Sequence, residues 1–150
     1  AVCKSFQVLY QFLLLFIFIG SVISSLKDVT SSVGLAGHDL GSLAAFGDFD
    51  ADKKADLFFI CNNVMNGKGK LDVYLWNSDS DEFEASSATI TLDQVNITNV
   101  IPGDFDSDGH LDALVSYHNK TLLSYKDQTF VKVFFGRDSH FGMSSSCSML

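Results

Sequence analysis

The sequence predicts an all-β protein in which a four-stranded unit occurs twice. Short apolar or alternating runs recur along the chain, and a loop with four aspartates is repeated 56 residues later (104 − 48 = 56). Outside the N-terminal segment, no stretch has the periodicity of an amphipathic helix. The composition agrees, since the 150 residues include 14 phenylalanines and one proline.

The first cycle of strands follows a polar lead-in, residues 26–42. Strands are indicated by short apolar runs or by alternation of apolar and polar residues, and turns by clusters of Asn, Gly, Asp and Ser. These patterns predict strands at 43–46, 57–61, 71–76 and 89–92.

The second cycle repeats this order. Its strands are predicted at 97–101, 113–117, 121–125 and 130–135. The serine-rich end, residues 143–150, has no strand pattern and is expected to be a disordered tail. Four-stranded units at this spacing are typical of β-propeller blades. We therefore expect a partial β-propeller of about two blades, with one repeat at 43–98 and a partial second repeat at 99–142.

The candidate functional residues of the sequence lie in the two aspartate loops. Each has aspartates at relative positions 1, 3, 5 and 9, which are Asp48, Asp50, Asp52 and Asp56 in the first loop and Asp104, Asp106, Asp108 and Asp112 in the second. Carboxylates this close repel one another unless a cation lies among them. Oxygen ligands on alternate residues of a tight loop favour Ca²⁺. An EF-hand is excluded, because it needs an acid at position 12, where Phe59 and Val115 stand.

Position 6 distinguishes the two loops. Gly109 in the second loop permits the positive φ that a tight loop needs, whereas the first loop has Lys53 at this position. Lys53 and Lys54 also place two positive charges near the cation. Both effects predict weaker calcium binding by the first loop. The alternative, that the loops are polar turns that bind nothing, stays open.

The N-terminal segment predicts export from the cell. Residues 6–23 are almost wholly apolar, Lys4 precedes them, and small and polar residues follow. This layout is typical of a secretory signal peptide over residues 1–25, with an uncleaved signal anchor as the alternative. In an exported chain, the two N-x-Thr sequons at Asn96 and Asn119 are candidate glycosylation sites.

Charge and side-chain chemistry exclude other classes of function. The net charge of −8 leaves no basic patch for nucleic acid. The four histidines are scattered without the spacing of a zinc site, and there is no nucleophile elbow, so we do not expect an enzyme. Cys61 and Cys147 could form a disulfide, or Cys61 could be a buried thiol, and the sequence leaves both open.

The aspartate loops and their flanks resemble the FG-GAP repeats of integrin alpha subunits. The resemblance is carried by "GSLAAFGDFDADKKADLFFI" at 41–60 and "NITNVIPGDFDSDGHLDALVSY" at 96–117. It implies an extracellular β-propeller in a secreted or single-pass type I membrane glycoprotein. It also implies an extracellular or cell-surface protein as the partner and, for the members most alike, modulation of T-cell function.

The resemblance further implies Ca²⁺ as the cofactor. Its ligands would be the eight aspartate side chains of the two loops and the backbone carbonyls of Lys54 and His110. A closed propeller needs at least four blades, so we expect a fragment of a larger protein, attached to the membrane by a signal anchor or by a C-terminal helix outside this chain. The alternative function is the FG-GAP module of an exported, phospholipase-like hydrolase whose catalytic domain is absent.

Overall fold

The computed structural model describes residues 27–37, 41–63, 67–119, 129–138 and 140–147, and this part of the chain is almost wholly β. The expected signal segment, residues 1–25, lies outside the described residues. Among the described residues, η1 (Thr30–Val33) is a short 3₁₀ helix. None of the helices in this part of the chain is long and apolar enough to cross a membrane.

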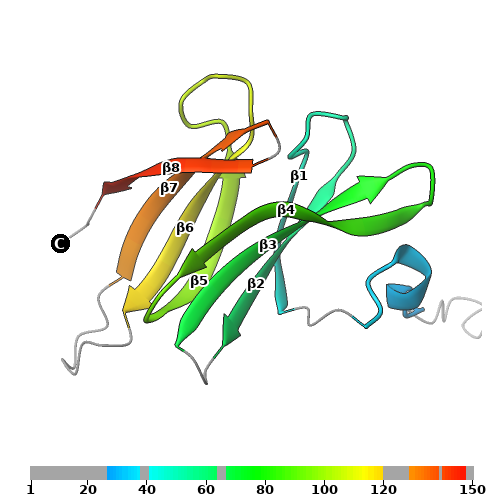
Figure 1. Ribbon diagram of the computed structural model, residues 1–150, viewed down its shortest axis with the longest axis horizontal. Helices are drawn as coiled ribbons and strands as arrows, with labels where there is room; N and C mark the ends of the chain where they lie inside the picture. The colour runs from blue at the N-terminus through cyan, green and yellow to red at the C-terminus, as the bar shows by residue number, and fades with distance from the viewer. Residues whose placement is uncertain (1–26, 38–40, 64–66, 120–128, 139, 148–150) are drawn as a thin grey trace, which may run out of the picture.

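Eight strands in the described residues form two four-stranded antiparallel sheets, and within each sheet every strand pairs with the next along the chain (Figure 1). The first sheet contains β1 (Ser42–Gly47), β2 (Asp56–Asn63), β3 (Lys68–Asn77) and β4 (Glu82–Leu92). The second sheet contains β5 (Val95–Gly103), β6 (Asp112–Asn119), β7 (Thr129–Arg137) and β8 (His140–Cys147). The predicted all-β fold of two blade-like units is confirmed.

The fourth strand of the second sheet is not the one that the sequence predicts. β8 lies in the serine-rich end, which we expected to be disordered, and it pairs with β7 from Arg137↔His140 to Val131↔Cys147. The predicted strand at 121–125 lies outside the described residues. Backbone hydrogen bonds hold an edge strand such as β8, so the ladder does not require apolar side chains. Sequence patterning therefore missed it.

The boundary between the sheets also differs from the expected division at residues 98 and 99. β4 ends at Leu92 and β5 begins at Val95, so the chain changes sheet at a two-residue turn. At this turn Gln94 has a φ of 56°. The polar residues early in β5 concealed the start of the strand, although Val95 and Ile97 are both buried there.

The two sheets pack on one hydrophobic core, and we call the faces that meet there the inner faces. The core includes Phe58, Ile60, Leu71, Val73 and Ile90 from the first sheet and Ile97, Val100, Ala113, Val115 and Phe134 from the second. The side chain of Asn62 joins the sheets as a strand would: its Nδ2 donates to the Ile97 carbonyl at 2.8 Å, and its Oδ1 accepts from the Ile97 N–H at 2.9 Å.

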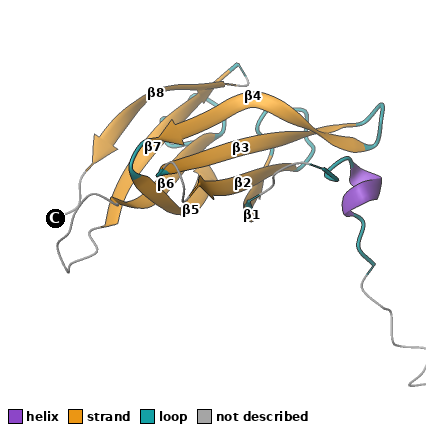
Figure 2. Cartoon of the chain, turned by 60° about the horizontal axis from the view of Figure 1, so that its bottom comes forward, coloured by secondary structure: helices purple, strands orange, loops and turns teal. Residues whose placement is uncertain are grey.

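The opposite face of the first sheet, its outer face, has a small core of its own. Leu57, Phe59 and Tyr74 are buried there, packed against Leu35 and Phe83. Leu35 comes from the segment that follows η1, and Figure 2 shows this segment beside the first sheet. The N-terminal part of the described chain therefore packs against the outer face of the first sheet through Leu35.

Candidate metal centre

Each aspartate loop joins the first two strands of its sheet. Residues 48–55 connect β1 to β2, and residues 104–111 connect β5 to β6. Both loops lie at the same end of the molecule, where Figure 1 shows them as the cyan and yellow loops at the top. The repeat in the sequence is thus also a repeat in space.

The last aspartate of each set is fully buried and ties its loop to the sheet. Asp56 and Asp112 are both 0% exposed. Their Oδ2 atoms accept hydrogen bonds from the backbone N–H groups of Phe49 and Phe105, each at 2.7 Å. Their Oδ1 atoms accept from the N–H groups of Trp76 at 3.0 Å and Gly136 at 2.8 Å, on the third strand of each sheet. The sequence motif predicted these two aspartates as metal ligands, but it did not reveal that their hydrogen bonds attach each loop to the third strand of its sheet.

Burial leaves the charge of Asp56 poorly solvated. Desolvation raises the pKa of Asp56, and the nearby Asp50 and Asp52 carboxylates raise it further, while the N–H groups of Trp76 and Phe49 lower it. A positive charge beside these carboxylates would offset both the desolvation and the repulsion.

The interiors of the two loops are held by matched hydrogen bonds. Lys53 N donates to Asp48 Oδ2, and Gly109 N donates to Asp104 Oδ2, both at 3.0 Å. One residue later, Lys54 N donates to Asp52 Oδ1 at 2.7 Å, and His110 N donates to Asp108 Oδ1 at 2.9 Å. Two loops of different sequence therefore share one backbone course.

Both loops have positive φ at two positions. At position 6, φ is 70° for Lys53 and 88° for Gly109, so the expected conformation is confirmed at this position. At position 4, φ is 62° for Ala51 and 61° for Ser107. Neither alanine nor serine is a sequence signal for positive φ, which is why position 4 was not foreseen.

Three carboxylates converge in each loop. In the first loop, oxygens of Asp48, Asp50 and Asp56 all lie within 4.8 Å of one another, and in the second loop the same holds for Asp104, Asp106 and Asp108. Asp52 and Asp112, which were also predicted as ligands, are not among these groups of three. The first group is partly to fully buried, whereas all three members of the second group are exposed.

The first loop also contains an unsatisfied atom. Asp48 Oδ1 is buried and has no hydrogen-bond partner. A buried carboxylate oxygen without a partner is destabilising unless a cation or a water reaches it. This atom, together with the all-oxygen donor set around it, fits a hard cation such as Ca²⁺.

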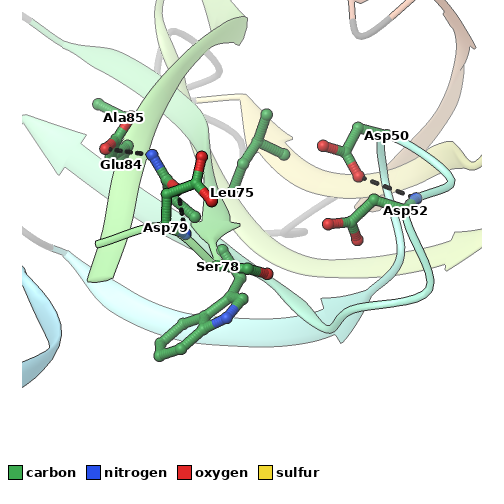
Figure 3. Close-up of a pocket in the computed structure, with 9 residues that line it drawn as sticks. Asp50, Asp52, Leu75, Ser78, Asp79, Glu84 and Ala85 are labelled. Carbon is green, nitrogen blue, oxygen red and sulfur yellow. Dashed lines mark hydrogen bonds between the residues drawn. The ribbon is translucent and has the colours of Figure 1, made fainter. Parts of the chain in front are cut away.

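A cleft of about 390 Å³ adjoins the first loop. Figure 3 shows Asp50 and Asp52 on one side of the cleft, Asp79 and Glu84 of the β3–β4 hairpin on the other, and Leu75 between them. The ammonium group of Lys54 donates to the hydroxyl group of Ser78, which also lines the cleft. The positive charge of Lys54 is therefore directed toward the hairpin.

The two sequon asparagines lie at one end of the second sheet. Asn96 on β5 is paired with His118, and Asn119 on β6 is paired with Val95. The hydroxyl group of Thr98, which completes the first sequon, is exposed and donates to the Ser116 carbonyl at 3.1 Å. The two candidate glycan positions are therefore neighbours on adjacent strands.

Comparisons with known proteins agree with this architecture. Residues 48–115, from the first aspartate loop into β6, match the family model described as FG-GAP-like repeat. The chain is 34% identical over 95 residues to the T-cell immunomodulatory protein of Rattus norvegicus, 32% over 115 residues to that of Homo sapiens, and 35% over 95 residues to that of Mus musculus. No solved structure matches the chain.

The alignments cover most of this chain but only a small part of each relative. They include 62%, 76% and 62% of this chain, but 14%, 18% and 14% of the three relatives. The chain therefore spans less than a fifth of the length of these relatives. The family match includes both aspartate loops and the strands between them, so this chain contains FG-GAP-like repeats over residues 48–115.

Proposed function

We propose that this chain is a calcium-stabilised protein-binding module on the extracellular side of the cell, that it belongs to a larger secreted or type I membrane glycoprotein, and that it modulates T-cell function. The name of its relatives, T-cell immunomodulatory protein, supports the T-cell role. FG-GAP repeats serve binding rather than catalysis, which supports an extracellular or cell-surface protein as the partner.

The observation that carries calcium binding is the buried, unpartnered Oδ1 of Asp48 within a group of three carboxylates. The side chains of Asp48, Asp50, Asp52 and Asp56 would hold one ion, with the carbonyl of Lys54. Those of Asp104, Asp106, Asp108 and Asp112 would hold a second, with the carbonyl of His110. Bound Ca²⁺ supplies positive charge that neutralises the carboxylates, and its role is structural.

Differential scanning calorimetry in excess CaCl₂ and in EDTA tests this proposal. A ligand at about a hundred times its dissociation constant stabilises the folded state by about 2.7 kcal/mol, so we expect the melting temperature to rise by several degrees in calcium. Asp48→Ala/Asp104→Ala should lose that rise, while Asp79→Ala, which removes an exposed carboxylate outside the loops, should keep it. An equal melting temperature in calcium and in EDTA would contradict calcium binding.

The cellular role needs a separate experiment. Fluorescently labelled protein should bind T cells in calcium, measured by flow cytometry, and binding should fall in EDTA and with Asp48→Ala/Asp104→Ala. A calcium-dependent melting temperature without binding to T cells would contradict the T-cell role and leave the calcium proposal standing.

Export and glycosylation are tested by expression in cultured mammalian cells. We expect peptide N-glycosidase to lower the apparent mass of the protein on a gel. Asn96→Gln and Asn119→Gln should each remove one of two glycans. An unchanged mass after the enzyme treatment would contradict glycosylation at both positions.

A further inference from the structure

The second sequon lies at the end of a strand that carries an aromatic side chain two residues earlier. β6 is regular from Ala113 to His118, where each residue is paired with one residue of β7. Side chains alternate between the two faces of a regular strand, so Tyr117 and Asn119 share a face, with their Cα atoms about 7 Å apart. Ala113 and Val115 precede them on this face and belong to the core, so it is the inner face.

Tyr117 is one member of an aromatic pair. Its ring is stacked on that of its cross-strand partner Phe130, with a centroid distance of 5.7 Å and an interplanar angle of 19°. Tyr117 also packs against the core, yet both residues are partly exposed. The pair therefore presents aromatic surface beside Asn119, at the end of β6 that lies away from the second aspartate loop.

The first sequon has no such pair. The residue two positions before Asn96 is Gln94, which lies in the turn between the sheets. Asn96 lies on the outer face, because the next residue, Ile97, belongs to the core. The side chains on this part of the outer face are polar, namely Thr98, Ser116 and His118.

The chemistry of the first sugar suits the aromatic pair. This sugar is N-acetylglucosamine, and one face of its ring consists of C–H groups. These hydrogens carry partial positive charge, whereas the face of an aromatic ring is negative, so the two surfaces attract each other and exclude water when they meet. A sugar on Asn119 lies within reach of the Tyr117 ring, because the two residues are neighbours on one face.

We propose that the aromatic pair of Tyr117 and Phe130 is the binding site for the first N-acetylglucosamine of the glycan on Asn119, and that this contact stabilises the fold. The inference rests on the glycosylation of Asn119 proposed above. It also assigns different roles to the two sequons: the sugar on Asn119 stabilises the folded chain, whereas the sugar on Asn96 leaves its stability unchanged.

Thermal melts of single-sugar forms test this inference. The full chain is expressed in cultured mammalian cells with kifunensine, which keeps N-linked glycans rich in mannose, and endoglycosidase H then trims each glycan to one N-acetylglucosamine. Asn96→Gln is the reference, since it keeps the sugar on Asn119 alone. Asn119→Gln or Thr121→Ala, added to the reference, removes that sugar. We expect each to lower the melting temperature by about 2–4 °C, the shift that one contact of ordinary strength gives in a chain of this size.

Two matched comparisons separate the aromatic pair from other effects of a sugar. Asn119→Gln keeps the sugar on Asn96, and it should melt within about 1 °C of Asn96→Gln/Asn119→Gln. Tyr117→Val keeps a side chain suited to a strand and removes the ring. When Tyr117→Val is added to the reference and to its sugar-free forms, we expect them to melt within about 1 °C of one another.

Mass spectrometry establishes whether Asn119 carries its sugar in each form. A sugar on Asn119 that does not raise the melting temperature, or that raises it equally in Tyr117→Val, would overturn this inference and leave glycosylation standing. An Asn119 without a sugar in the folded protein would overturn both. The comparison of the reference with its two sugar-free forms remains decisive even if Tyr117→Val does not fold.

Discussion

The two repeats share their loop geometry and differ in what surrounds it. Hydrogen bonds to Asp48 and Asp56 in the first loop recur at Asp104 and Asp112 in the second. The first loop lies against a neighbouring sheet, so Phe49 is 4% exposed, whereas Phe105 is 44% exposed. Local sequence therefore sets the course of each loop, and the neighbouring sheet sets its burial.

The largest difference in the free energy of unfolding is expected between alanine variants of Phe49 and of Phe105. Phe49→Ala should lower the free energy of unfolding by about 3–5 kcal/mol, because it leaves a cavity between the sheets. Phe105→Ala should lower it by less than about 1 kcal/mol, because its ring is already half exposed. Urea denaturation followed by circular dichroism measures both. Equal losses would show that the two aromatic side chains are equally buried in solution.

Substitution of the buried aspartates should have the next largest effect on stability. Asp56→Ala removes the acceptor of one buried and one partly buried N–H group, so we expect a loss of about 2–4 kcal/mol in EDTA, where no metal contributes. Asp112→Ala should behave alike, since its hydrogen bonds match. Asp79→Ala is the control for removal of one carboxylate and should change stability by less than about 0.5 kcal/mol. If all three variants melt alike, the buried hydrogen bonds do not stabilise the loops.

We expect the two loops to differ in calcium affinity. The sequence predicts weaker binding by the first loop, because of Lys53 and Lys54. However, Lys53 has the same left-handed backbone conformation as Gly109, so the two loops present their carboxylates on the same backbone course. The more buried carboxylates of the first loop attract a cation more strongly. We therefore expect Asp48→Ala to lose more of the calcium-induced rise in melting temperature than Asp104→Ala. The reverse order would favour the sequence argument.

The smallest effect is expected at position 6. Lys53→Gly relieves a side chain held at positive φ, at the expense of greater freedom in the unfolded chain, so we expect a gain of about 0.5 kcal/mol. Gly109→Ala should lose about 1 kcal/mol. Thermal melts in EDTA measure both changes. A loss of stability in Lys53→Gly would mean that the lysine side chain makes contacts that outweigh the strain.

Much of the fold could be predicted from the sequence. Alternation and short apolar runs located seven of the eight strands in the described residues, since a strand with one buried face imposes period two on its side chains. β8 was not predicted, because the backbone hydrogen bonds that hold an edge strand do not require a particular residue pattern. The repeat of the aspartate loops was visible because their spacing is set by local turns.

The site was predicted in part. The aspartates and the positive φ of Gly109 follow from local chemistry, and the sequence shows them. The two hydrogen bonds to the carboxylates of Asp56 and Asp112 do not, because Trp76 and Gly136 lie 20 and 24 residues further along the chain. Pairing with the third strand brings these donors to the loop, and sequence spacing carries no sign of it.

By itself the sequence determined the two aspartate loops, seven of the eight strands in the described residues and the repeat. Only the tertiary structure decided that Phe49 is buried between the sheets, that Phe105 is exposed, and that Trp76 and Gly136 donate to the buried aspartates. Hydrogen bonds within a loop depend on residues a few positions apart. Burial depends on which sheet lies beside each loop. Phe49 and Phe105, the same residue type at the same loop position, therefore differ in exposure.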